Sequence, residues 1–236
     1  MDGITEQIRN AILSGQLQPG EKLPAERELA GQLGVNRLTL RAALSRLEAI
    51  ALIDTRHGTR SVVRNFRENA GIDTFPDLIR LCRENDPPLF VKLARDVFDL
   101  RRALAIEAVA FAAERRTDED LAAIRAAVAL QQARIGDVLA FARGDLHVAR
   151  LVVRASKNLA LEMLLNTIMR VPEDDPMLLR AMYPSPRAQY RHYDVVLHLI
   201  ETGAGALARD AMRSALEALD RVTMARLERE TSKGTP

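Results

Sequence analysis

Six arginines gather in residues 36–64, where only Glu48 and Asp54 oppose them, so this stretch carries a charge of about +4. They are Arg37, Arg41, Arg46, Arg56, Arg60 and Arg64. The whole chain of 236 residues has a net charge of +2, so the other residues sum to about −2. A guanidinium stays charged, and its fork of N–H groups fits a phosphate or the major-groove edge of guanine. The concentrated charge therefore predicts a surface that contacts a nucleic acid.

A second chemically informative residue is Arg101, which interrupts an apolar helical pattern formed by Val97, Leu100 and Leu104. A guanidinium on an apolar helix face is costly without an anionic partner. The partner is either a phosphate or carboxylate of a bound ligand, or an acidic side chain such as Asp145. The sequence leaves both alternatives open.

Other spacings that carry chemistry are scarce. The sequence has no phosphate-binding glycine loop, no nucleophile elbow and no cysteine cluster. Its histidines are His57, His147, His192 and His198. They do not lie at metal-ligand spacing, and His147 is only two residues from Asp145, which puts the two on different faces of a helix. We expect no enzyme activity, no cofactor and no metal site.

Composition indicates a globular chain, with 47% apolar and 28% charged residues. No apolar run approaches the roughly 20 residues that span a bilayer. The amphipathic, partly acidic N-terminus does not have the pattern of a signal sequence. The single cysteine, Cys82, cannot form an internal disulfide, which fits a reducing compartment. We therefore expect a cytoplasmic protein with no membrane partner.

Three helical patterns must position the basic stretch. Isoleucines recur every four residues from position 4 to position 12 and predict a helix over about residues 2–14. A second helix is predicted to run to about residue 33, with Pro24 in its first turn, where proline is tolerated. Gly34 then supplies a turn, and Asn36 is suited to cap a third helix through its side-chain oxygen.

The third helix has a clear buried stripe of Leu40, Leu44 and Leu47. Arg37 and Arg41 lie off this stripe, near the N-terminal end of the helix. A helix presented to the major groove of DNA places its N-terminal residues on the base edges. The third helix is therefore predicted to be a recognition helix.

A β-hairpin is predicted after these helices. Residues 51–53 start a strand, residues 57–59 can form the tip, and residues 61–63 return. Three helices followed by a hairpin form a winged helix-turn-helix. The alternative is a three-helix domain with no role in nucleic-acid binding, which would leave the clustered arginines unexplained.

The rest of the chain is predicted to be helical, so the fold class is mainly α. The winged helix-turn-helix occupies residues 1–66, and a linker with one short helix, at about residues 76–83, occupies residues 67–88. An all-α effector-binding bundle of six or seven helices follows over residues 89–232. Thr117 and Asn158 are expected to begin helices and Gly203 to end one. Predicted helices include one ending near residue 116 and others at about 118–134, 137–155, 159–170, 186–202 and 204–230.

Three motifs in the first 75 residues resemble known regulators. The motif LPAERELA (residues 23–30), the turn LGVNR and the recognition helix with Arg41 resemble the DNA-binding domain of the bacterial GntR family. The helical second domain is similar to that of the FadR subfamily. The segment HGTRSVVRNFRENAG (residues 57–71) resembles the fatty-acid-responsive FadR regulators, whose wing tip also carries His-Gly. The resemblance covers nearly the whole chain but is strongest in the first 75 residues.

This resemblance implies which residues contact DNA. They are Arg27, Asn36, Arg37, Thr39 and Arg41 around the recognition helix, and His57 and Gly58 at the wing tip. It also implies a homodimer on a palindromic operator, because two-fold symmetry in the protein matches two-fold symmetry in the site. Asn36 and Leu38 stand where the fatty-acid regulators have threonine. We therefore expect a similar but not identical operator.

The resemblance also bears on metal binding. Many relatives hold a metal through one aspartate and three histidines, and use it to bind an organic acid. Asp145 matches the aspartate, but Ala149, Tyr193 and Ala215 stand at the histidine positions. The fatty-acid-responsive members also lack the metal and have tyrosine at the position of Tyr193.

Those members bind a long-chain acyl-CoA in the helical bundle. Arg101 matches an arginine that contacts the ligand there, and Asp145, Tyr183 and Tyr193 are the other candidate ligand-binding residues. Against this interpretation, Leu216 stands where those regulators have glycine.

Together these features predict a dimeric transcription factor of fatty-acid metabolism that long-chain fatty acyl-CoA releases from its operator. The resemblance implies a repressor of fatty-acid degradation and, in some members, an activator of unsaturated fatty-acid synthesis. One alternative is a GntR-type regulator that responds to a small organic acid. Another is an acyl-CoA-binding or acyl-CoA-hydrolysing protein with a vestigial winged domain, which the clustered arginines argue against.

Overall fold

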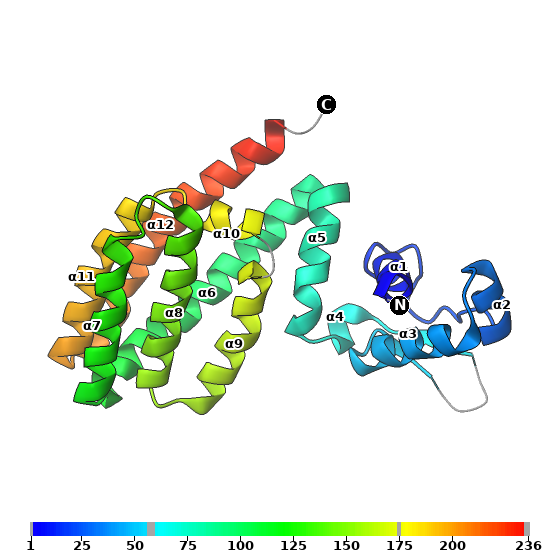
Figure 1. Ribbon diagram of the computed structural model, residues 1–236, viewed down its shortest axis with the longest axis horizontal. Coiled ribbons are helices and arrows are strands. Elements are labelled where there is room, and N and C mark those ends of the chain that lie inside the picture. The colour runs from blue at the N-terminus through cyan, green and yellow to red at the C-terminus, as the bar shows by residue number, and fades with distance from the viewer. Residues whose placement is uncertain (1, 56–59, 174–175, 234–236) are drawn as a thin grey trace. The chain divides into compact units, whose positions relative to one another are not determined.

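The computed structural model describes residues 2–55, 60–173 and 176–233. The chain divides into two compact units, Met1–Asp86 and Pro87–Pro236 (Figure 1). Each unit has its own apolar core. The mainly α fold class is confirmed, with a winged helix-turn-helix in the first unit and a helical bundle in the second. None of the described helices is long and apolar enough to cross a membrane.

The first unit contains the three predicted helices, α1 (Asp2–Leu13), α2 (Glu26–Gln32) and α3 (Arg37–Ala49). Two short antiparallel strands follow, β1 (Ile53–Asp54) and β2 (Val62–Val63), with Ile53 opposite Val63. An isolated bridge from Lys22 to Val62 adds a third segment beside the hairpin. The predicted wing is therefore present, but its regular ladder is shorter than the sequence pattern indicated.

The leucine stripe of α3 forms the centre of this unit. Leu40 and Leu47 are fully buried and Leu44 is 5% exposed, as the helical spacing predicts. They pack against the isoleucines of α1 and against Leu52 and Ile53 at the start of the hairpin. This packing fixes the rotation of α3 about its axis and so decides which of its side chains face solvent.

Local chemistry sets the start of the recognition helix. Gly34 adopts a left-handed backbone conformation (φ 67°), which glycine tolerates without steric cost. The Asn36 side chain accepts a hydrogen bond from the Thr39 amide at 2.8 Å, so the predicted N-cap is confirmed. Pro24 was expected in the first turn of the second helix. It lies before the helix, since α2 begins at Glu26 with Ala25 at its N-cap.

Residues 66–85 continue the first unit. They form α4 (Phe66–Asn69), a short 3-10 helix η1 (Ile72–Thr74) and α5 (Phe75–Asn85), which is longer than the short helix predicted at residues 76–83. Leu78 and Leu81 of α5 pack on the core of the unit, and Asp77 forms a 2.8 Å ion pair with Arg9 of α1. Most of the segment predicted as a linker is therefore packed structure up to Asp86.

The second unit is entirely helical over its described residues. Its helices are α6 (Pro87–Arg115), α7 (Asp118–Gln132), α8 (Val138–Ala155), α9 (Leu159–Glu173), α10 (Pro176–Met182), α11 (Pro186–Thr202) and α12 (Gly205–Lys233). The two 29-residue helices α6 and α12 pack along each other. Helix α8 contacts α7 on one side and α9 on the other (Figure 1).

Helix α6 differs from its sequence pattern in two ways. Pro87 and Pro88 open the helix rather than ending a linker, because proline lacks only an N–H that the first turn leaves unpaired anyway. Leu100, expected on the buried face, is 37% exposed, whereas Phe98 and Ile106 are buried. The buried face therefore shifts around the helix axis along the 29 residues of α6.

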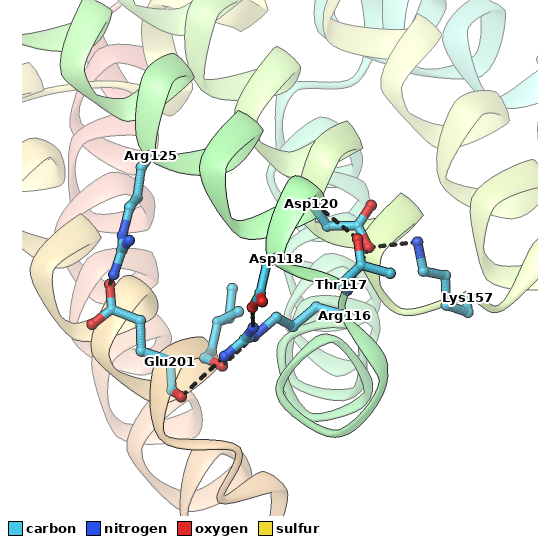
Figure 2. Close-up of polar contacts among 8 residues, drawn as sticks. Arg116, Thr117, Asp118, Asp120, Arg125, Lys157 and Glu201 are labelled. Carbon is cyan, nitrogen blue, oxygen red and sulfur yellow. Dashed lines mark hydrogen bonds and ion pairs between the residues drawn. The ribbon is translucent and has the colours of Figure 1, made fainter.

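A capping box begins α7, as predicted (Figure 2). The Thr117 amide donates to the Asp120 carboxylate at 2.8 Å, and the Asp120 amide donates to the Thr117 hydroxyl at 3.2 Å. Lys157 forms a 2.5 Å ion pair with the same carboxylate. Burial raises the pKa of Asp120, but the bonds from Lys157 and Thr117 outweigh this effect and hold the pKa below its usual value.

Two arginines, one just before α7 and one within it, bind the end of α11 (Figure 2). Arg116 donates to the main-chain carbonyls of Ile200 and Glu201, at 3.4 and 3.3 Å, which the end of α11 leaves without helical partners. Arg125 of α7 forms a 2.8 Å ion pair with the Glu201 side chain. The predicted end of α11 at Gly203 is confirmed by its left-handed conformation.

Gly144 allows α7 and α8 to approach each other closely. A β-carbon at this position would overlap the side-chain amide of Gln131, which is fully buried. Gly144→Ala should therefore destabilise the second unit by about 1–3 kcal/mol, since a packed core does not accept the extra methyl group. Urea denaturation followed by circular dichroism measures the change.

Gly136→Ala is the matched control for this substitution. A β-carbon at Gly136 would have no heavy atom within 4 Å, so that variant should unfold like the parent chain. Equal denaturation midpoints for the two variants would contradict the close packing of α7 on α8.

Candidate functional site

The first candidate site is the exposed N-terminal end of α3. Arg37 and Arg41 are exposed there, off the buried leucine stripe, and Thr39 is half-buried. Leu38 lies among them and is 80% exposed, the highest value of any large apolar side chain in the described part of the chain. The helix therefore offers solvent a basic surface with one apolar side chain in it.

Asn36 has a structural task as well as its implied contact with DNA. Its side-chain oxygen holds the Thr39 amide, so replacing it would also disturb the first turn of α3. The DNA contacts assigned to Arg27, Asn36, Arg37, Thr39 and Arg41 stay predictions. Arg27 is exposed on α2, in the same unit as the other four.

Arg41 has a partner that the sequence patterns did not reveal. Its Nε atom donates to Oε2 of Glu26 at 2.7 Å, which joins α3 to the first residue of α2. The two residues are 15 positions apart, so no helical spacing rule detects the pair. Only the packing of α2 on α3 brings them together.

The wing adds further positive charge. Arg60 and Arg64 are exposed on the returning strand segment. The strands are joined near the tip by a 3.0 Å hydrogen bond between the hydroxyl groups of Thr55 and Ser61. His57 and Gly58, the predicted wing-tip contacts, lie outside the described residues.

The second candidate site is a polar cluster inside the helical unit. Asp145 of α8 accepts hydrogen bonds from the hydroxyl of Tyr183, at 2.6 Å, and from that of Tyr193. Gln131 of α7 donates to the Tyr193 oxygen at 3.1 Å and to the Phe141 carbonyl at 2.9 Å. The structure thus brings together three of the four predicted ligand-binding residues, and adds Gln131.

Burial determines the protonation of the two tyrosines. It is the main reason that the pKa of Tyr183 and the pKa of Tyr193 both lie well above their usual value, and the adjacent Asp145 charge raises them further. Both phenols therefore stay protonated and donate to Asp145. The charge of Arg101 opposes the rise in the pKa of Tyr183, so Arg101 acts electrostatically on this cluster.

Arg101 itself is paired with Asp220, not with Asp145. Its terminal nitrogen lies 2.6 Å from Oδ1 of Asp220 on α12, and Arg102 binds the other carboxylate oxygen at 2.7 Å. Of the two alternatives for the partner of Arg101, the structure shows an acidic side chain. The residue is Asp220, so the suggestion of Asp145 was wrong. Asp220 is 119 positions from Arg101, and only the pairing of α6 with α12 shows the contact.

One nitrogen of Arg101 is still unused. The Nε atom is buried and has no hydrogen-bond partner among the described residues. A buried N–H without a partner is uncommon in folded proteins and costs free energy. It is therefore a candidate contact for an anionic ligand.

The donor set around Asp145 does not suit a metal ion. Both carboxylate oxygens accept hydrogen bonds from phenols, and the positions that would carry histidines hold Ala149, Tyr193 and Ala215. The described residues contain no group of three or more histidine, cysteine, aspartate or glutamate side chains that could hold a metal.

The fold and these two sites define a winged helix-turn-helix protein with a separate helical domain. Residues 1–63 match the bacterial regulatory proteins of the gntR family, and residues 96–218 match the FCD domain. The chain belongs to the GntR family and carries an FCD domain as its second unit.

Individual relatives agree with this assignment. The chain is 38% identical to an uncharacterized HTH-type transcriptional regulator of Mycobacterium tuberculosis over 162 residues, 68% of this chain and 63% of that protein. It is 40% identical to the fatty acid metabolism regulator protein of Escherichia coli O1:K1 / APEC over 88 residues, 37% of each chain. The alignments thus span less than two thirds of these relatives.

A solved structure supports the fold. The GntR protein of Streptococcus agalactiae superposes with a TM-score of 0.52 at 23% identity, covering 92% of this chain and 97% of that one. At this identity the similarity extends to the arrangement of helices and not to the chemistry of either site.

The buried tyrosines predict how the second unit responds to alkali. In the unfolded chain tyrosines ionise near pH 10, whereas Tyr183 and Tyr193 keep their protons when folded. The unfolded state then binds fewer protons, so stability is full below about pH 10 and falls as pH rises above it. We expect the tyrosinate absorbance of these two residues to appear together with loss of the circular-dichroism signal.

Single Tyr→Phe variants assign the absorbance, because the chain contains only Tyr183, Tyr190 and Tyr193. Ionisation of Tyr183 or Tyr193 in a fully folded protein near pH 10 would contradict the buried hydrogen-bonded arrangement.

Proposed function

We propose that this chain is a transcriptional regulator of fatty-acid metabolism that binds a palindromic operator as a homodimer. A long-chain fatty acyl-CoA is the proposed effector, and its binding weakens the affinity for DNA. The observation that carries the DNA-binding part is the exposed basic end of α3 in a unit of the GntR family.

The proposed DNA contacts follow from the chemistry of the exposed side chains. Arginines on the first turns of a recognition helix can bind the O6 and N7 atoms of guanine as a fork. Arg60 and Arg64, exposed beyond the helix, suit phosphate contacts that add affinity without sequence preference. Two units related by two-fold symmetry would read two half-sites of a palindrome.

The proposed effector site is the Arg101 region. Arg101 shares Asp220 with Arg102, and Arg102 has a second acidic partner, Asp99, at 2.5 Å. If a ligand anion bound Arg101 in place of Asp220, Asp220 would still be paired with Arg102. The buried carboxylate would therefore keep a cationic partner. The unused Nε of Arg101 is a further donor for that anion.

The same ion pair offers a route for coupling. Arg101 lies on α6 and Asp220 on α12, so a ligand that weakens their contact changes how these long helices are held. Helix α6 begins at Pro87, directly after the end of the first unit at Asp86. If the effector binds one arrangement of α6 more tightly than another, its binding shifts the protein toward that arrangement and so alters DNA binding.

Two observations favour an acyl-CoA over the alternative, a small organic acid. The unsuitable metal donor set around Asp145 argues against a metal-held small carboxylate. The 40% identity to a protein named fatty acid metabolism regulator favours a lipid.

Removal of the Arg41 side chain tests the DNA-binding proposal. A duplex selected from a randomised pool by the parent protein serves as the probe. Arg41→Ala should lower the preference for this duplex by about 1–3 kcal/mol per lost bidentate contact. The parent affinity should fall steeply between about 50 and 200 mM salt.

Arg125→Ala is the matched control, since Arg125 is also an exposed arginine in an ion pair with a glutamate but lies in the second unit. It should bind the duplex like the parent protein. Failure of the parent to select any duplex, or binding that ignores salt, would refute the proposal.

Removal of the Arg101 side chain tests the effector proposal. Isothermal titration with palmitoyl-CoA should show binding to the parent protein and a loss of about tenfold or more in Arg101→Ala, since hydrogen bonds to charged groups contribute about 1.5–3 kcal/mol. The variant should still prefer the selected duplex over a random one, because Arg101 lies outside the first unit.

Arg102→Ala breaks the other bond to Asp220 and controls for loss of that ion pair. It should retain palmitoyl-CoA binding. Binding of succinate but of no acyl-CoA would favour the small-acid alternative, and equal losses in both variants would show a structural role for Asp220 instead.

A further inference from the structure

We propose that Glu26 is a positioning residue for operator recognition. Its carboxylate holds the guanidinium of Arg41 so that the two terminal nitrogens face away from the protein as a fork for guanine. This inference rests on the proposed DNA-binding function and adds Glu26 to the residues that determine sequence preference.

The hydrogen-bond geometry supports this role. Glu26 binds the Nε atom of Arg41, through Oε2 at 2.7 Å. A guanidinium is planar and carries five N–H groups, so use of Nε leaves the four on the terminal nitrogens free to donate. Those two nitrogens are the pair that matches the O6 and N7 acceptors of guanine.

The exposure of the pair argues against a purely structural role. The Arg41 side chain is 66% exposed and that of Glu26 is 38% exposed. Ion pairs this accessible to water contribute little to folding stability. Fixing a long arginine side chain before binding, however, lowers the entropy lost when it meets a base.

The negative charge of Glu26 also supports a positioning role. A carboxylate close to a DNA-binding surface repels phosphates, so it weakens non-specific binding. The described arginines of the basic stretch, Arg37, Arg41, Arg46, Arg60 and Arg64, are all exposed, and Glu26 pairs with one of them. A carboxylate in this place is therefore explained better by orientation of Arg41 than by attraction to DNA.

Glu26→Gln separates orientation from simple electrostatics. Removing the negative charge should raise the affinity for a random duplex by a few-fold, since repulsion of phosphates is lost. A neutral amide oxygen holds the Arg41 guanidinium less firmly than a carboxylate does, so the ratio of selected-duplex to random-duplex affinity should fall by about five- to tenfold. Fluorescence anisotropy with both duplexes gives the ratio.

Glu28→Gln is the matched control. Glu28 lies in the same first turn of α2, is exposed, and has no ion-pair partner among the described residues. It should shift both affinities by the same factor and leave the ratio unchanged. Thermal melting checks that both variants fold like the parent.

A double variant shows whether Glu26 acts through Arg41. In an Arg41→Ala background, Glu26→Gln should change the ratio no further. A further fall would mean that Glu26 contacts the bases itself, and an unchanged ratio in the single Glu26→Gln variant would mean no positioning role; either result overturns the inference. A parent protein without any preferred duplex would instead overturn the proposed function, and this role with it.

Discussion

The ion pair between Arg101 and Asp220 joins the two longest helices of the second unit, and it holds a half-buried guanidinium against a buried carboxylate. Asp220 is 5% exposed and satisfies two arginines at once. The positive charge of Arg101 also acts on the tyrosine cluster, where it opposes the rise in the pKa of Tyr183. A charged group that cannot lose its proton must be paired wherever water is excluded, so Arg101 connects α6, α12 and the candidate effector site.

Arg41 also has an acidic partner, although water is not excluded around it. Its pair with Glu26 lies in water, where it adds little stability but restricts the direction of the side chain. In both units, then, an arginine with an acidic partner from another helix stands at the candidate site. In the second unit the proposed effector anion competes for the arginine, whereas in the first the acid orients the arginine toward its proposed base.

Local sequence patterns were sufficient wherever the physics is local. The Leu40, Leu44 and Leu47 stripe, the Asn36 cap and the Thr117 capping box all follow from spacings of three or four residues, and each was confirmed. Glu26, Gln131 and Asp220 could not be found in this way, because their partners Arg41, Tyr193 and Arg101 lie 15, 62 and 119 positions away. The segment around α5 was predicted as a linker because of its prolines and charged residues, although Leu78 and Leu81 in it pack on the core of the first unit.

We propose that occupation of the helical unit changes the affinity of the winged unit for DNA. The direct measurement is fluorescence anisotropy of the selected duplex, titrated with the 236-residue chain at fixed salt, with and without saturating palmitoyl-CoA. We expect an increase of about tenfold or more in the Kd for DNA with palmitoyl-CoA, within the usual range of coupling between sites, and no change with succinate. An unchanged Kd with every acyl-CoA chain length, together with release by a small carboxylate, would contradict it.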